Sequence, residues 1–246
     1  MVKIIYTDKN TDSYEKTVCC IGYFDALHKG HQELIKRTVE LSHSKNLKAG
    51  LICFEPDPTD VITGKKQKHI FSFNQRTELM ESFGIDIVYI IHFDEEFMKS
   101  EPKVFINDYL NVMNIDTLVC GFDYSFGYKG KGNSRLLKKY GTFNTEVIEE
   151  YTYYGKKISS TRIRDAIYKG NIRLAEKLLG FEYYAEVITD KCVQMEDKWL
   201  IEAHTAEEDI LLPHKYILND ICIDNDNIFI SSDSGIKKGK RLKIKL

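Results

Sequence analysis

Short apolar runs alternate with amphipathic helical patterns along the first 150 residues of this chain. Five runs rich in apolar and β-branched residues are typical of strands, at about residues 17–22, 49–54, 86–92, 117–120 and 145–150. Between them, apolar residues recur at helical spacing at about residues 31–44, 74–83, 102–112 and 134–140. Strands that alternate with helices predict parallel βαβ units, because a parallel pair needs a crossover connection. We therefore expect an α/β domain with a doubly wound parallel sheet.

The sequence pattern changes after Gly180. From Tyr183 onward the chain consists of short alternating runs broken by Asp, Asn, Gly and Lys, namely YAEVIT, KWLIEAH, KYILNDICI, NIFISS and RLKIKL. Such runs predict strands of a small antiparallel β domain. We place the domain boundary near residue 182, with an α/β domain at 1–182 and a β-rich domain at 183–246.

Composition favours a small-molecule enzyme of the cytoplasm. The 246 residues hold 35 Lys and Arg against 37 Asp and Glu, and this net charge of −2 predicts no nucleic-acid partner. The basic run from Lys237 to Lys245 fits an edge strand protected by lysines better than a nucleic-acid patch. The start MVKIIYTDKN is unlike an export signal, and no apolar run approaches the roughly 18 residues of a membrane span. The six cysteines form no C-x-x-C pair, so we expect free thiols in a reducing compartment.

The most specific motif is GYFDALHKGH, from Gly22 to His31. A strand that breaks at Gly22 and leads into a helix near His31 brings free backbone N–H groups and the positive end of the helix dipole to one place. Gly30 lets the backbone approach an anion, and His28 and His31 can donate hydrogen bonds to phosphoryl oxygens. Two histidines three residues apart could instead bind zinc, although no third ligand stands at a recognisable spacing, or could be purely structural. The motif favours a phosphate site.

A second candidate anion site lies in ISSTRIRD, residues 158–165. Ser159, Ser160 and Thr161 are suited to cap a helix N-terminus. Arg164 can bind phosphate through two hydrogen bonds and stays charged. By itself, this segment is more typical of a well-capped surface helix.

Two further loops follow predicted strands. In LICFEPDP, residues 51–58, the two prolines end the strand and make a rigid loop at its carboxyl end, where open α/β sheets bind ligands. In GFDYSFGYKGKGN, residues 121–133, four glycines and two lysines form a loop that can surround an anionic ligand. Each loop alone would equally fit an ordinary turn.

Taken together and in their order along the chain, the four segments resemble the bacterial FAD synthetases, the FMN adenylyltransferases of the nucleotidyltransferase superfamily. The corresponding family patterns are G-x-F-D-x-x-H-x-G-H, F-x-P-H-P, G-x-D-F-x-F-G-x-x-x-x-G and S-S-T-x-I-R. The resemblance continues through the segment 170–180 and covers about residues 15–182. Asp57 stands where the family commonly has histidine, which places an acid near an anion site.

The resemblance implies transfer of AMP from ATP to FMN, giving FAD and pyrophosphate without a covalent enzyme intermediate. It implies His28, His31 and Arg164 as catalytic residues. The implied ATP site comprises Gly22, Phe24, Asp25, His28, Gly30, His31, Ser159, Ser160, Thr161 and Arg164. The implied flavin site comprises Phe54, Pro56, Pro58, Asp123 and Phe126. Magnesium would enter with ATP, held by phosphate oxygens and water, so no protein metal ligand is expected.

Family members usually carry a riboflavin kinase domain with a G-x-P-T-A-N loop after the adenylyltransferase domain. No such loop occurs between Tyr183 and Leu246, so we expect no kinase activity. Two alternatives stay open. The chain could transfer a nucleotide to a different phosphorylated acceptor, or it could be a regulatory protein that binds flavin or nucleotide without catalysis.

Overall fold

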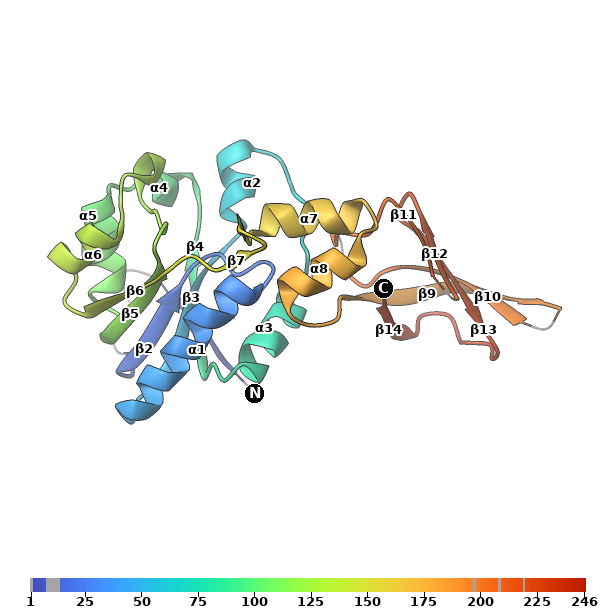
Figure 1. The fold of residues 1–246 in the computed structure, drawn as a ribbon, viewed down its shortest axis with the longest axis horizontal. Helices are drawn as coiled ribbons and strands as arrows, with labels where there is room; N and C mark the ends of the chain where they lie inside the picture. Colours follow the sequence, from blue (N-terminus) through green and yellow to red (C-terminus); the bar gives the residue numbers. More distant parts are fainter. Residues whose placement is uncertain (1, 8–13, 197, 208, 219) are drawn as a thin grey trace. The chain divides into compact units, whose positions relative to one another are not determined.

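The computed structural model describes residues 2–7, 14–196, 198–207, 209–218 and 220–246. The chain packs as two units (Figure 1). The first unit contains the residues up to Gln67 and the segment Asn74–Lys157, and the second contains Lys68–Phe73 and Ile158–Leu246.

A six-stranded parallel sheet forms the centre of the first unit (Figure 1). Its strands are β1 (Lys3–Thr7), β2 (Thr17–Ile21), β3 (Lys48–Glu55), β4 (Ile87–His92), β5 (Ile115–Gly121) and β6 (Asn144–Ile148). They lie in the order β1-β4-β3-β2-β5-β6, and every neighbouring pair is parallel. The predicted doubly wound parallel sheet is confirmed. From β2 the chain builds outward in one direction through β3 and β4, and then in the other through β5 and β6. The point of reversal, between β2 and β5, is where such sheets bind ligands.

Helices cover both faces of this sheet. Helix α1 (Lys29–Ser44) packs on β2, β3 and β5 through a buried side that includes Leu34 and Ile35. On the other face, Phe105 and Leu137 join a core cluster with side chains of β2 to β5. The remaining helices of the unit are α2 (Pro58–Thr63), α3 (Phe73–Ser82), α4 (Glu95–Met98), α5 (Pro102–Phe105) and α6 (Ser134–Tyr140). Burial on both faces explains why the strand sequences are continuously apolar.

Three elements of the first unit differ from those expected from the sequence. The helix expected at 102–112 is present from Pro102 to Leu110, but it begins as α5 and continues as a π-helical turn at Ile106–Leu110. Strand β1 was not predicted, since its run KIIYT is mostly exposed at the sheet edge and lacks a buried apolar pattern. The short hairpin of β7 (Thr152–Tyr153) and β8 (Lys156–Lys157) was also not predicted.

The second unit begins with two helices, α7 (Ser160–Tyr168) and α8 (Ile172–Leu179), and continues as a six-stranded antiparallel sheet. Its strands are β9 (Tyr184–Met195), β10 (Lys198–Thr205), β11 (Lys215–Leu218), β12 (Ile221–Asp224), β13 (Asn227–Ser232) and β14 (Arg241–Lys245). In the order β11-β12-β13-β10-β9-β14 they curl into a half-barrel (Figure 1). The predicted antiparallel β domain is confirmed.

The run KYILNDICI was expected as one strand, and this is wrong. It folds back on itself as β11 and β12, which pair Lys215 with Asp224. Polar residues such as Asp220 interrupt the apolar pattern at its middle and favour a turn.

By packing, the two units divide before Ile158, whereas the sequence pattern changes near residue 182. The ring of Phe71 lies 5.8 Å from that of Phe181 and 5.7 Å from that of Tyr183, measured between centroids. The Tyr183 hydroxyl donates a 2.6 Å hydrogen bond to the carbonyl of Leu211. These contacts join the segment 68–73 to the residues just before β9, and join those residues to the half-barrel. A division of activities at residue 182 stays a prediction.

All six cysteines are free, and Cys19, Cys20, Cys53 and Cys120 are buried. Burial raises the pKa of the Cys19 and Cys53 thiols to about 12, so both stay protonated at neutral pH. Among the helices that the structure describes, none has the length and apolar character to traverse a bilayer.

Candidate functional site

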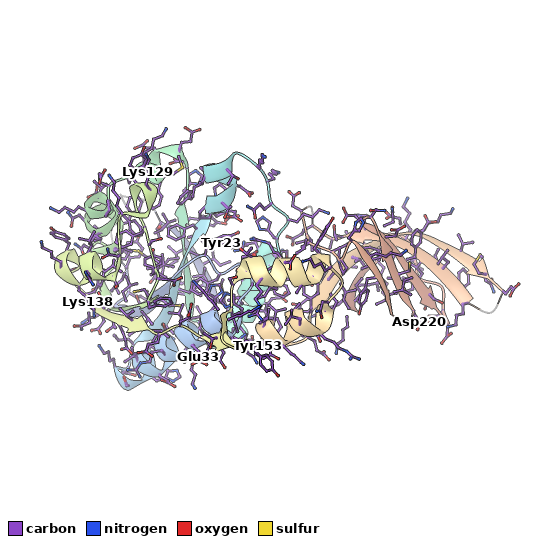
Figure 2. All side chains as sticks on the ribbon, turned by 45° about the horizontal axis from the view of Figure 1, so that its top comes forward. Tyr23, Glu33, Lys129, Lys138, Tyr153 and Asp220 are labelled. Carbon is purple, nitrogen blue, oxygen red and sulfur yellow. The ribbon has the colours of Figure 1, made fainter. Side chains whose placement is uncertain are left out.

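The loops that follow β2, β3, β4 and β5 surround a cavity of about 760 Å³ at the carboxyl edge of the parallel sheet. Gly22 and Tyr23 come directly after β2, and Phe54 lies near the end of β3. Figure 2 shows Tyr23 in this unit and Lys129 in the glycine-rich loop after β5. The other lining residues are Pro58, Ile62, Phe93, Phe97, Met98, Ser100, Phe105, Tyr124, Ser125, Phe126, Gly127, Tyr128 and Gly130. The volume and the aromatic lining suit a planar ring system.

Aromatic side chains form a continuous wall of the cavity. Phe97 is central, with its ring centroid 5.3 Å from that of Phe93, 5.5 Å from that of Phe105 and 6.0 Å from that of Phe54. Phe105 in turn lies 5.3 Å from Phe126. Most of these pairs are edge-on or tilted, the geometries that aromatic rings prefer. The wall therefore offers apolar ring surface to a ligand.

The segment that supplies Gly22 and Tyr23 leads directly to the N-terminus of α1, which His28 caps. The His31 backbone N–H donates a 3.2 Å hydrogen bond to Nδ1 of His28. The two imidazole rings stack, with centroids 3.8 Å apart and planes at 12°. Because Nδ1 of His28 accepts this bond, a neutral His28 carries its proton on Nε2, which is then a donor. The helix start also leaves the N–H groups of Lys29 and Gly30 without a preceding carbonyl in the helix.

Both histidines are neutral at physiological pH. Burial lowers the pKa of His28 to about 4; the nearby charge of Lys157 contributes to this shift, whereas a backbone hydrogen bond and the charge of Asp25 oppose it. Burial also holds the pKa of His31 well below its usual range, with the adjacent His28 adding to the effect. The Nδ1 atom of His31 is buried and makes no hydrogen bond to the described residues. The pair therefore offers N–H dipoles to an anion, while positive charge would have to come from other side chains.

Two neighbours shape this loop. A Cβ atom on Gly30 would lie 3.2 Å from Cε1 of His28, so glycine leaves room for the capping ring. Lys157 forms an ion pair with Asp123 and lies close enough for its charge to act on His28. Lys157 was not predicted as a site residue, because the adjacent pair Lys156 and Lys157 carries no specific sequence signal.

A second group of buried polar residues lies beside the cavity. The Arg76 guanidinium lies 5.7 Å from the centre of the Tyr23 ring. Burial raises the pKa of the Tyr23 phenol well above its usual range; Arg76 opposes this shift, and Asp25 and Asp57 add to it. Asp25, Asp57 and Arg76 are all less than a tenth exposed.

The predicted second anion site forms the N-terminus of α7 in the second unit. The Ser159 hydroxyl accepts a 3.3 Å hydrogen bond from the Arg162 N–H and caps the helix, as expected. Ser160 and Thr161 occupy the first turn, and Arg164 lies on the same helix with part of its guanidinium buried. Because these residues belong to the second unit, their participation in one site with His28 stays a prediction.

Comparison with known proteins identifies the family. The sequence model described as FAD synthetase matches residues 10–162. The chain belongs to the FAD synthetase family. It is 36% identical over 183 residues to the bifunctional riboflavin kinase/FMN adenylyltransferase of Listeria monocytogenes, an alignment that covers 73% of this chain and 58% of the relative. The corresponding Buchnera aphidicola protein from Acyrthosiphon pisum is 30% identical over 261 residues, covering all of this chain and 83% of the relative.

A solved structure shares the fold of the whole chain. The crystal structure described as a macrolide-efflux protein from Streptococcus pneumoniae superposes with a TM-score of 0.86, covering 100% of this chain and 98% of that one at 24% identity. At this identity the likeness concerns the fold alone. The chain spans little more than half the length of most of the bifunctional relatives it matches, such as 56% of the Bacillus subtilis protein.

Within this FAD synthetase family member, the structure brings together many of the residues expected to bind ATP or flavin. Gly22, Phe54, Pro58 and Phe126 line the cavity. Phe24 is fully buried, and its ring packs edge-on against that of His31, with the centroids 5.0 Å apart. Asp25, described above, is fully buried as well.

Two residues expected at the flavin site lie elsewhere in the first unit. Pro56 is exposed and is not part of the cavity wall, and the Asp123 carboxylate is paired with Lys157. Conversely, Phe93, Phe97 and Phe105 were not predicted. Their sequence signal was the pair of phenylalanines four residues apart directly after β4, at the ligand-binding edge of the sheet.

Proposed function

We propose that this chain is an FMN adenylyltransferase, which transfers AMP from ATP to FMN and gives FAD and pyrophosphate. One observation carries the proposal. The loop between β2 and α1 lines an aromatic cavity at Gly22 and Tyr23 and, six residues later, forms a helix N-terminus capped by His28. A planar flavin in the cavity would therefore have a phosphate-binding helix start at its side. Family membership points to the same substrates.

The proposed reaction is an in-line displacement at phosphorus. A phosphate oxygen of FMN forms a bond to the α-phosphorus of ATP, the bond from that phosphorus to the α,β-bridging oxygen breaks, and pyrophosphate leaves with the electron pair. The FMN phosphate is already anionic near neutral pH, so no general base is required. The protein's contribution is positioning and charge stabilisation.

Neutral histidines suit this chemistry. The Nε2–H of His28 and the N–H groups of Lys29 and Gly30 would donate to phosphate oxygens as charge develops during the displacement. Lys157 would add positive charge beside His28. Ser159, Ser160, Thr161 and Arg164 at the start of α7 would hold the leaving pyrophosphate.

Magnesium would enter as part of the ATP complex and would screen the phosphate charges. The residues that the structure describes contain no cluster of three or more His, Cys, Asp or Glu side chains that could hold a metal ion. The donor set near α1 consists of N–H groups, which bind anions and not cations. In this proposal, magnesium would be held mainly by the substrate's oxygens and by water.

The same proposal assigns no riboflavin kinase activity to residues 183–246. This segment contains no G-x-P-T-A-N loop of the kind that the kinase domains of the family carry. The half-barrel would then serve to support α7 and α8, which belong to the same packed unit.

The experiment incubates the protein with ATP, magnesium and either FMN or riboflavin and separates the flavins by chromatography. We expect FAD from FMN and unchanged riboflavin. His31→Ala should lower kcat/KM about 100-fold or more, as expected for a side chain that orients the donors at a developing charge. His43→Ala, an exposed histidine in the last turn of the same helix, should change it less than twofold.

A second pair of variants tests the proposed role of α7 in binding pyrophosphate. Arg164→Gln should lower turnover by a similar factor, whereas Arg173→Gln, on the exposed side of α8, should leave it unchanged. FMN formed from riboflavin would contradict the absence of kinase activity. No FAD from FMN under any of these conditions would refute the proposed reaction.

A further inference from the structure

We propose that Lys129, in the glycine-rich loop after β5, binds the pyrimidine edge of the flavin ring and so sets the orientation of the acceptor in the aromatic cavity. This inference deepens the proposed function and rests on it, since it concerns the cavity assigned to FMN. It gives a role to a charged side chain at the rim of a wall that is mostly apolar.

Polar groups are unevenly distributed over the cavity wall. Apart from Ser100, the lining residues from β3 and from the segments after β3 and β4 are apolar, namely Phe54, Pro58, Ile62, Phe93, Phe97, Met98 and Phe105. The loop after β5 instead supplies Ser125, Lys129 and the backbone of Gly127 and Gly130. The flavin ring has a matching asymmetry, with an apolar dimethylbenzene edge and a pyrimidine edge that carries two carbonyl groups. The glycine-rich loop therefore suits the pyrimidine edge.

Lys129 is the side chain of this loop that is free to meet a ligand. Among the described residues that line the cavity, it alone carries a charge, and it forms no ion pair with any described residue. Its Nζ atom lies 5.3 Å from the centre of the Tyr128 ring, which also lines the cavity. Lys131, by contrast, has its Nζ atom 3.9 Å from Oε1 of Glu101. The ammonium donors of Lys129 are thus available at the rim.

The loop that carries Lys129 is anchored. The N–H groups of Phe126 and Gly132 donate to each other's carbonyl oxygens, at 3.2 and 2.7 Å. The Tyr128 N–H donates a 2.8 Å hydrogen bond to the carbonyl of Ser100. Lys129 has φ 55° and ψ 28°, a left-handed conformation that glycine or asparagine adopts at lower cost. The turn by itself does not favour a lysine, which points to a function of the side chain.

The pyrimidine edge offers acceptors for an ammonium group. The C2 carbonyl oxygen and N1 of the oxidised ring carry partial negative charge, and a cation beside them changes the electronic properties of the flavin. The phosphate of FMN would lie at the start of α1, where His28 and backbone N–H groups are the proposed donors. Lys129 would therefore recognise the ring and not the phosphate.

A cycle that changes both the protein and the ligand tests this contact. Calorimetry gives the dissociation constants of FMN and of 2-thio-FMN, in which sulfur replaces the C2 oxygen, for wild type and Lys129→Met. Sulfur is a weaker hydrogen-bond acceptor, so we expect the variant and the analogue each to weaken binding about fivefold. The two changes together should cost little more than either alone, because the second removes a contact already lost.

Two further ligands separate the ring edges and the phosphate. Lumiflavin has the ring without the ribityl phosphate, and Lys129→Met should weaken its binding by the same factor as that of FMN. The analogue 8-chloro-FMN is changed at the opposite edge, so its affinity relative to FMN should not depend on Lys129. The visible absorption spectrum of bound FMN should differ between wild type and Lys129→Met, because the charge beside the ring is lost.

Lys131→Met is the matched control. Lys131 lies in the same loop, with its Nζ atom 5.6 Å from the centre of the Tyr128 ring, but it is not part of the cavity lining. We expect this change to alter FMN affinity less than twofold, and Lys129→Arg, which keeps the charge, to retain most of it. Thermal unfolding checks each variant. Lys129→Asn replaces Lys129→Met in the cycle if the latter does not fold, since asparagine is favoured in the left-handed region.

Independent effects of Lys129→Met and the C2 sulfur would overturn the inference. Weaker binding of FMN with unchanged binding of lumiflavin would also overturn it and assign Lys129 to the phosphate, and equal losses in Lys129→Met and Lys131→Met would reduce its role to general charge. These outcomes leave the proposed function intact if wild type makes FAD. Coupled loss of FMN binding in a protein that makes no FAD would support the flavin contact and refute the reaction. Failure of wild type to bind FMN would overturn both.

Discussion

Replacing His28 by asparagine separates the structural role of this side chain from its proposed chemical role. In the structure, Nδ1 of His28 accepts the 3.2 Å hydrogen bond that caps α1, and the ring stacks on His31 at 3.8 Å. Asparagine is among the most favoured N-cap residues, so His28→Asn can keep the cap. It removes the imidazole and with it the Nε2–H donor.

The expected magnitudes differ strongly between stability and activity. Loss of the ring stacking costs about 0.5–1.5 kcal/mol of unfolding free energy, which corresponds to a fall of about 1–6 °C in Tm for a chain of this size. His28→Ala, which also loses the cap, should cost about 1 kcal/mol more. Loss of one N–H donor aimed at developing negative charge costs about 3–4 kcal/mol of transition-state stabilisation, or about 100- to 1,000-fold in kcat.

The assay combines steady-state FAD formation, followed by chromatography, with thermal unfolding of wild type, His28→Asn and His28→Ala. Equal, large losses of activity in both variants with a clear difference in Tm would support the two separate roles. If His28→Asn keeps more than a tenth of the wild-type kcat, the imidazole is not a transition-state donor, and capping α1 is its whole contribution.

Three further predictions use the same structure. The pKa of His28 falls from its ordinary 6.5 to about 4 on folding, so its neutral form stabilises the fold fully above pH 6.5 and this contribution is lost as pH drops toward 4. Because of His28, the free energy of urea unfolding should be about 2 kcal/mol lower at pH 5 than at pH 7. The His28→Asn variant should lose less stability over the same pH range. Equal losses in wild type and variant would contradict the assignment of this pH dependence to His28. Phe97→Ala should weaken FMN binding at least tenfold in a fluorescence titration, because Phe97 is central to the cavity wall. The control is Phe122→Ala; Phe122 is 49% exposed and outside the cavity lining, so this change should alter FMN binding less than twofold. Equal effects of the two variants would argue against the cavity as the flavin site. Lys157→Ala should raise the pKa of His28 in an NMR titration and weaken ATP binding several-fold by calorimetry, and unchanged ATP affinity would remove Lys157 from the phosphate site.

The fold of the first unit was predictable because its strands are buried on both faces. Runs such as TVCCI and IVYIIH are continuously apolar, and each is followed or preceded by a helix-period segment, which leaves few topologies open. The exceptions have local causes. Strand β1 is stabilised by parallel pairing with β4 and not by its own pattern. In KYILNDICI, the turn depends on a few polar residues inside an otherwise strand-like run.

The backbone of the candidate phosphate loop was also predictable, but the protonation state of its histidines was not. Consecutive residues from Thr17 to His31 determine a strand, a break and a capped helix start, so the sequence predicts this local backbone. That His28 is the cap and both histidines are neutral depends on burial and stacking by neighbours such as Phe24. Burial is a property of the packed unit.

The sequence by itself determined the local backbone and the family, because strand, turn and helix-cap patterns act between residues a few positions apart. Only the tertiary structure decided which side chains share the cavity. Phe54 lies near the end of β3, Phe97 follows β4 and Phe126 follows β5, and the sheet order brings these segments together. It also decided that Asp57, which from sequence alone was an acid close to an anion site, is a buried side chain that caps α2. Contacts of this kind depend on strand order and side-chain packing, which no short-range pattern encodes.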